Sequence, residues 1–142
     1  MGHYEFLEEI AIADCAVQLE GADLADLFET AARALAEVMA DPATVPMTAR
    51  RTIALEADTL ELLLYDWLSE LIFRKDRDAE VYPRARVAIA GDGPFQLAAE
   101  VEGGPLDPAT VHLRSDPKAV TFYQFALEPV GRGWRARVVI DI

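Results

Sequence analysis

The stretch TLELLLYDWLSELI, residues 59–72, decides the fold of this sequence. Its apolar residues recur at every third or fourth position, which is the spacing of residues on one face of a helix. They are Leu60, Leu63, Leu64, Trp67, Leu68, Leu71 and Ile72. The run Asp58-Thr59-Leu60-Glu61 resembles a capping box, a pattern that satisfies the free amides of a first helical turn. We therefore predict an amphipathic helix that opens at this box and buries one face.

A second helix is expected earlier in the chain, between Asp23 and the pair Asp41-Pro42. Apolar residues again recur at helical spacing, namely Leu24, Leu27, Phe28, Ala31, Leu35, Val38 and Met39. Aspartate is a favoured N-cap residue, and proline cannot continue a helix. Asp23 is therefore expected to cap this helix, and Pro42 to lie beyond its end.

Residues 6–19 favour a β-strand that ends at Gly21, because small and β-branched residues predominate there. Near its end, Cys15, Val17 and Leu19 alternate with Ala16 and Gln18. Successive side chains of a strand point to opposite faces, so Asp14 should face away from Cys15. The alternation also predicts that Cys15 is shielded together with Val17 and Leu19.

Further strands are predicted at residues 51–57, 85–89, 95–101, 120–127 and 134–142. Glycine-rich turns at residues 91–93 and 131–133 join the last four of these into two hairpins. Two one-sided helices and a sheet that needs cover indicate an α+β fold. We expect a β-sheet sandwich covered on one face by two amphipathic helices, as one domain over residues 1–142.

The net charge restricts the kinds of partner that this protein can bind. Thirteen basic and 25 acidic residues give a formal charge of −12, which repels phosphate backbones over most of the surface. Direct nonspecific nucleic-acid binding is therefore not expected. A basic protein partner or a divalent cation suits this field better.

Cysteine content and the N-terminus favour a protein of the cytoplasm. Cys15 is the only cysteine, which excludes an intramolecular disulfide and a zinc site of several cysteines. The first residues lack the basic and apolar regions of a signal peptide, and no apolar run reaches membrane-spanning length. Export and membrane insertion are not expected.

The sequence offers few groups for catalysis. His3 and His112 are its only histidines, and no nucleophile elbow, phosphate loop or dinucleotide fingerprint occurs. The last predicted strand, however, ends at Asp141 followed by Ile142, and Asp141 faces away from Ile140. A side-chain carboxylate and a terminal carboxylate would then lie within one residue of each other, and both are hard oxygen donors.

Four stretches, taken together, resemble the archease family. They are Tyr4-Glu5-Phe6-Leu7-Glu8, Leu63-Leu64-Tyr65-Asp66-Trp67-Leu68, Lys118-Ala119-Val120-Thr121 and Val138-Val139-Ile140-Asp141-Ile142. They cover nearly the whole chain in the family's order. The resemblance implies a helix-covered β-sandwich that is not an enzyme. It also implies a partner, the manganese- and GTP-dependent tRNA-splicing RNA ligase, whose guanylylation and multiple turnover such a protein promotes.

The resemblance further implies an acidic metal site. Its oxygen ligands would be Asp14, Asp141 and the carboxylate of Ile142, a set that suits calcium, or magnesium, better than zinc. In the family, the first aspartate belongs to a His-Thr-Ala-Asp motif, and here Ala11 and Ile12 occupy the His and Thr positions.

Two other positions bear on this site. The family commonly has an aromatic residue and a histidine where this chain has Phe122-Tyr123. His112 lies close to a position before the Lys118-Ala119 pair where the family often has a histidine.

Two alternatives remain open from the sequence. In the first alternative, the chain is a diverged archease-fold binding module that has lost ligase activation. The missing His-Thr pair is the argument for this alternative. In the second alternative, the chain is a metal-dependent hydrolase in which Asp14 and Asp141 hold a cation that activates water. The second alternative needs a general base, and neither histidine is placed near the aspartates by the sequence.

Overall fold

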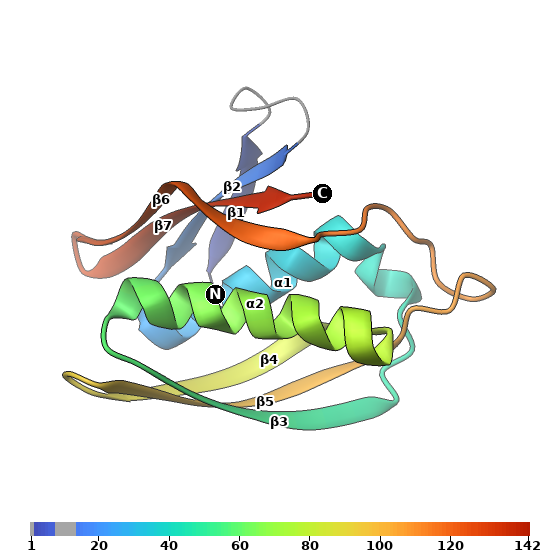
Figure 1. Cartoon of the computed structure of the whole chain (residues 1–142), viewed down its shortest axis with the longest axis horizontal. Helices are drawn as coiled ribbons and strands as arrows, with labels where there is room; N and C mark the ends of the chain where they lie inside the picture. Colours follow the sequence, from blue (N-terminus) through green and yellow to red (C-terminus); the bar gives the residue numbers. More distant parts are fainter. Residues whose placement is uncertain (1, 8–13) are drawn as a thin grey trace.

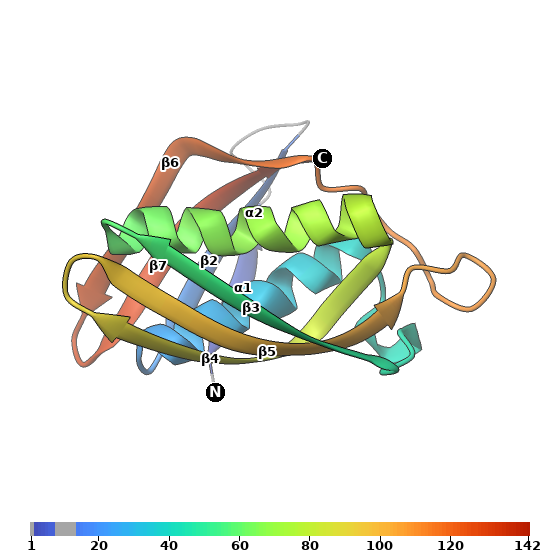
Figure 2. The ribbon, with the colours of Figure 1, turned by 60° about the horizontal axis from the view of Figure 1, so that its bottom comes forward.

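The computed structural model describes residues 2–7 and 14–142, which form two antiparallel β-sheets with two long helices between them (Figure 1). The α+β sandwich predicted from the sequence is confirmed. The helices lie between the sheets, so each sheet turns one face toward the helices and the other face outward (Figure 2). The described helices include none that is long and apolar enough to cross a membrane.

The first sheet joins both ends of the described chain. Its strands are β1 (His3–Leu7), β2 (Asp14–Gly21), β6 (Ala119–Val130) and β7 (Gly133–Asp141), in the spatial order β1-β2-β7-β6. The prediction of one strand from residue 6 to Gly21 was wrong in its first part. Phe6 pairs with Val17 across antiparallel strands, so the chain reverses direction between β1 and β2. The alternation from Cys15 to Leu19, and the strand end at Gly21, are confirmed.

The second sheet combines the β4–β5 hairpin with β3, a strand from earlier in the chain that pairs with β5. It consists of β3 (Ala49–Ala57), β4 (Glu80–Gly91) and β5 (Phe95–Pro105), in the order β3-β5-β4. The two predicted hairpins, β4 with β5 and β6 with β7, are both present. Gly131, in the β6–β7 turn, has a φ of 59°, a conformation that glycine adopts without steric cost.

Both predicted helices form, and their N-caps can be assigned. In α1 (Leu24–Met39), the Asp23 carboxylate accepts a hydrogen bond from the Asp26 amide at 2.8 Å, as expected of the cap. In α2 (Leu60–Asp78), Thr59 is the cap, because its hydroxyl accepts from the Leu62 amide at 3.2 Å. Thr59 lies within the run Asp58–Glu61, so the predicted opening of α2 at this box is confirmed. A short 3-10 helix, η1 (Pro42–Thr44), follows α1.

The core lies where the two helices meet. Trp67 of α2 and Phe28 of α1 are fully buried, and the Trp67 indole Nε1 donates a hydrogen bond to the Phe28 carbonyl at 2.9 Å. The predicted apolar stripe of α2 is buried except for Leu60, which is partly buried. Large apolar residues of both sheets pack onto the same cluster, including Val17, Leu97 and Ile140. The helices therefore fix the position of one sheet relative to the other.

Candidate functional site

The candidate acidic site lies where β2 begins and β7 ends. The two strands are antiparallel, and their register places Asp14 directly opposite Asp141. Directly opposed residues of an antiparallel pair have Cβ atoms about 4.5–5.5 Å apart, close enough for their side chains to interact. Two aspartates from opposite ends of the sequence are thus neighbours because β2 pairs with β7.

Asp14 and Asp141 lie on the outer face of the first sheet, away from the helices. Their neighbours one residue along, Cys15 and Ile140, face the core. Both aspartates are partly buried. The next outward pair along the strands, Ala16 and Val139, is at most 2% exposed. The carboxylates therefore border an apolar patch rather than open water on that side, and two like charges so placed repel each other.

A hydroxyl group near Asp141 lacks a hydrogen-bond partner among the described residues. Thr121 of β6 pairs with Val139, and its Oγ1 is buried without a partner in the described part of the chain. Ala119 pairs with Asp141, which makes Thr121 a diagonal neighbour of that aspartate on the same face, about 7–8 Å away. Buried hydroxyls are normally hydrogen-bonded, so Thr121 is a further oxygen at this edge that sequence analysis did not select. The sequence signal that could have selected Thr121 is its position in the family-like stretch Lys118-Ala119-Val120-Thr121.

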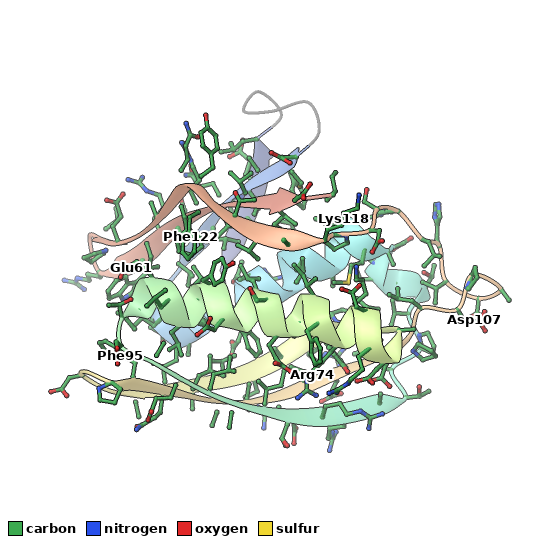
Figure 3. All side chains as sticks on the ribbon, viewed as in Figure 1. Glu61, Arg74, Phe95, Asp107, Lys118 and Phe122 are labelled. Atoms are coloured by element: carbon green, nitrogen blue, oxygen red, sulfur yellow. The ribbon has the colours of Figure 1, made fainter. Side chains whose placement is uncertain are left out.

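The backbone around Asp141 is held from two directions. Lys118, labelled just before β6 in Figure 3, donates its amide to the Asp141 carbonyl at 2.7 Å, which joins the start of β6 to the end of β7. Lys118 in turn follows Asp116 and Pro117, and both are anchored by the ammonium group of Lys75 of α2. The Lys75 Nζ to Pro117 carbonyl distance is 2.6 Å.

Lys75 is 8% exposed, which is unusual for a lysine. Burial by itself would lower the pKa of Lys75, but hydrogen bonds to Asp116 and Asp76, and the attraction of both carboxylates, outweigh it and raise that pKa. The ammonium group therefore stays charged and keeps its contacts with the loop. This contact between α2 and the loop supports the edge where Asp141 lies.

The carboxylates of Asp14 and Asp141 suit a hard cation only if further carboxylates also bind it. In the ranges 2–7 and 14–142, no three residues among the histidines, cysteines, aspartates and glutamates are grouped to hold a metal. The Ile142 side chain packs against the core at the end of β7, one residue beyond Asp141. Carboxylate oxygens are the ligands that calcium and magnesium prefer.

The histidines lie elsewhere. His112 is exposed in the loop next to η1, where its amide donates to the Thr44 hydroxyl at 3.0 Å and its carbonyl accepts from the Asp41 amide at 2.9 Å. His3 is exposed on β1. Ala11 and Ile12, which stand at the His and Thr positions of the family motif, lie outside the described residues.

Cys15 is shielded only in part. It faces the core at the end of β2 but remains partly exposed, and burial raises the pKa of its thiol. A raised thiol pKa reduces the thiolate fraction at neutral pH, and the thiolate is the reactive form. Cys15 therefore packs as a small apolar residue beside the acidic edge.

The fold and the position of the aspartate pair together define a class of protein. In this class, two helices lie between two antiparallel sheets, and aspartates from the first and last parts of the chain face each other on paired strands. The model of the Archease protein family matches residues 4–142. Protein archease of Methanosarcina acetivorans is 36% identical over 141 residues, which cover 98% of this chain and 95% of that protein. The chain belongs to the archease family.

Solved structures agree with this assignment. The solution structure of protein 1598 of Methanobacterium thermoautotrophicum has a TM-score of 0.80 and 30% identity, over 98% of each chain. A crystal structure from Thermotoga maritima, described as an archease and possible chaperone, has a TM-score of 0.65. Its identity is 18%, over 99% of this chain and 100% of that one, so it shows the shared fold.

Proposed function

We propose that this protein activates the tRNA-splicing RNA ligase, promoting its guanylylation and multiple turnover, and that it joins no RNA itself. The membership of the archease family supports a role with a protein partner. The acidic composition also suits a protein partner better than an RNA strand. We place this activity in the cytoplasm.

The observation that carries the proposal is the pairing of Asp14 with Asp141. We propose that these two carboxylates and that of Ile142 bind a divalent cation, calcium or, failing that, magnesium. Three carboxylates at one edge repel one another, and a hard cation relieves that repulsion. The cation would supply a fixed positive charge at an otherwise acidic edge, and Asp14, Asp141 and Ile142 would hold it there. The Thr121 hydroxyl, an oxygen without a hydrogen-bond partner among the described residues, supports this proposal.

The test is multiple-turnover ligation by the cognate ligase, with and without this protein. We expect the parent protein to raise the number of turnovers per ligase, and Asp14→Asn and Asp141→Asn each to lower that gain. Asp92→Asn is the matched control, because Asp92 is an exposed aspartate in the β4–β5 turn. Unchanged turnover at stoichiometric parent protein would contradict the proposal. RNA joining by this protein alone would contradict its non-enzymatic part.

One sequence observation supports a second candidate function. Ala11 and Ile12 replace the family's His-Thr pair, so a binding module that keeps the fold without activating the ligase is the alternative. It predicts that the protein binds the ligase with no change in turnover. Measuring binding and turnover on the same preparation separates the two functions.

A further inference from the structure

Strand β6 carries an arch of four residues, Phe122–Phe125. Thr121 pairs with Val139 and Ala126 with Arg137, so four residues of β6 stand opposite a single residue of β7. Within the arch, Gln124 has a φ of 52°, a left-handed conformation that is uncommon for residues other than glycine. Bulges and strained backbone of this kind cluster at functional sites.

The arch brings aromatic side chains onto α2. The Phe122 ring stacks on the Tyr65 ring with centroids 4.3 Å apart and an interplanar angle of 8°. Phe125 meets both rings edge-on, at 5.8 Å from Phe122 and 6.3 Å from Tyr65. Phe122 nevertheless stays 59% exposed, and Leu62, three residues before Tyr65 on α2, is 41% exposed. We call Tyr65, Phe122, Phe125 and Leu62 the aromatic patch.

Carboxylates flank the aromatic patch on both sides. Residues four apart on a helix are neighbours, so Glu61 adjoins Tyr65, and Asp66 adjoins Leu62. Figure 3 shows Glu61 at the start of α2. In the described part of the chain, neither carboxylate has a lysine, arginine or histidine nitrogen within 4.0 Å. Asp66 is partly buried, and this burial raises the pKa of its carboxyl group.

Two other aromatic rings of this protein are covered by its own arginines. The Arg77 guanidinium lies 5.0 Å from the centroid of Phe73, and that of Arg33 lies 5.6 Å from the centroid of Tyr4. Among the described residues, no cation lies over Phe122 or Tyr65 in the same way. An aromatic ring beside unpaired carboxylates is the environment that a guanidinium group fits, because it stacks on the ring and donates to the carboxylate together.

We propose that the aromatic patch, with Glu61 and Asp66, is the docking site for an arginine-bearing segment of the partner protein. The guanidinium stacks on Phe122 and donates to Glu61 or Asp66, while its apolar stem lies along Leu62. This inference rests on the proposed function, in which the partner is the ligase. In this proposal the acidic site at Asp14 and Asp141 changes the ligase's turnover, and the aromatic patch determines the affinity for the ligase.

The first experiment titrates ligase turnover against protein concentration. We expect Phe122→Ser, and separately the pair Glu61→Gln with Asp66→Asn, to raise the half-saturating concentration about tenfold, as interface aromatic and charged anchors do. The maximal turnover should stay that of the parent. Phe73→Ser is the matched control, since Phe73 lies on the same helix and is 50% exposed. A parental half-saturating concentration for both variants, with parental melting temperatures, overturns the proposal.

The second experiment separates this inference from the proposed function. Fluorescence anisotropy measures binding of two labelled 12-residue peptides, alternating arginine with leucine or lysine with leucine. We expect the parent to bind the arginine peptide about tenfold more tightly, and Phe122→Ser to remove that preference. Equal affinity of the parent for both peptides overturns the docking site. If the preference holds but ligase turnover never changes, the docking site stands and the proposed activation fails.

Discussion

Asp14 of β2 lies directly opposite Asp141 of β7, although 126 residues separate them in the 142-residue chain. Their pairing predicts that the fold is stabilised by a divalent cation, because a ligand that binds only the folded state raises the free energy of unfolding. At a calcium concentration about 100 times the dissociation constant, the gain is about 2.7 kcal/mol. Thermal unfolding with and without calcium, and then with magnesium, measures it.

Three variants test which groups hold the cation. Asp14→Asn, Asp141→Asn and a one-residue extension after Ile142 should each reduce the calcium-dependent rise in melting temperature, whereas Asp92→Asn should retain it. All variants should keep the circular dichroism of the parent. Equal calcium stabilisation in parent and in all three variants means that the cation, if bound, lies elsewhere.

The hydrogen bond from Trp67 of α2 to Phe28 of α1 predicts how a substitution at position 67 changes stability. Trp67→Phe removes the 2.9 Å hydrogen bond to the Phe28 carbonyl and leaves unfilled volume in a fully buried position. The free energy of unfolding should fall by about 2–3 kcal/mol. Urea unfolding followed by circular dichroism measures the change. Phe73→Leu, at an exposed position of the same helix, should change it by less than about 0.5 kcal/mol.

Ala79 ends α2 in a conformation that favours glycine. Its φ is 52°, and its amide donates to the Lys75 carbonyl at 2.9 Å. Ala79→Gly should therefore raise the free energy of unfolding by about 0.5–1 kcal/mol, because glycine adopts this conformation without steric cost. Ala54→Gly, on an exposed strand position of β3, should lower it by a similar amount. A lower melting temperature for Ala79→Gly would be the contrary outcome.

Tyr82 predicts how stability changes in alkaline solution. Burial, a 2.5 Å hydrogen bond to the Glu80 carboxylate and the charge of that carboxylate raise the pKa of Tyr82 to about 12. In the unfolded chain the phenol titrates near 10, so between about pH 10 and 12 the folded state binds more protons. The contribution of Tyr82 is therefore constant below about pH 10 and is lost as the pH rises to about 12.

The measurement is urea unfolding at pH 8, 10 and 11.5 for the parent and Tyr82→Phe. The parent should lose more stability than the variant between pH 10 and 11.5, since the variant has no phenol at position 82 to ionise. The difference between the two proteins removes the effect of Lys75 and the other groups that titrate in the same range. Identical losses would show that the Tyr82 phenol does not differ between folded and unfolded states.

The sequence by itself determined the elements whose signals are local. The apolar stripe of α2, the Asp23 cap of α1 and the glycine turns of both hairpins depend on residues a few positions apart, and all are present. The alternation along β2 likewise fixed that Asp14 and Cys15 face opposite ways. In the candidate site, the end of the last predicted strand pointed to Asp141 and Ile142, whereas Asp14 was selected through the family's motif.

Only the tertiary structure decided how distant segments meet. The pairing of β1 with β2, the place of both helices between two sheets and the pairing of Asp14 with Asp141 all join residues without a local signal. The arch at Phe122–Phe125 interrupts the alternation of β6. The Phe122 ring of this arch stacks on Tyr65, which lies more than fifty residues earlier in the chain. Local patterns record which face of an element is apolar, whereas the partner of that face is chosen by packing and strand register over the whole chain.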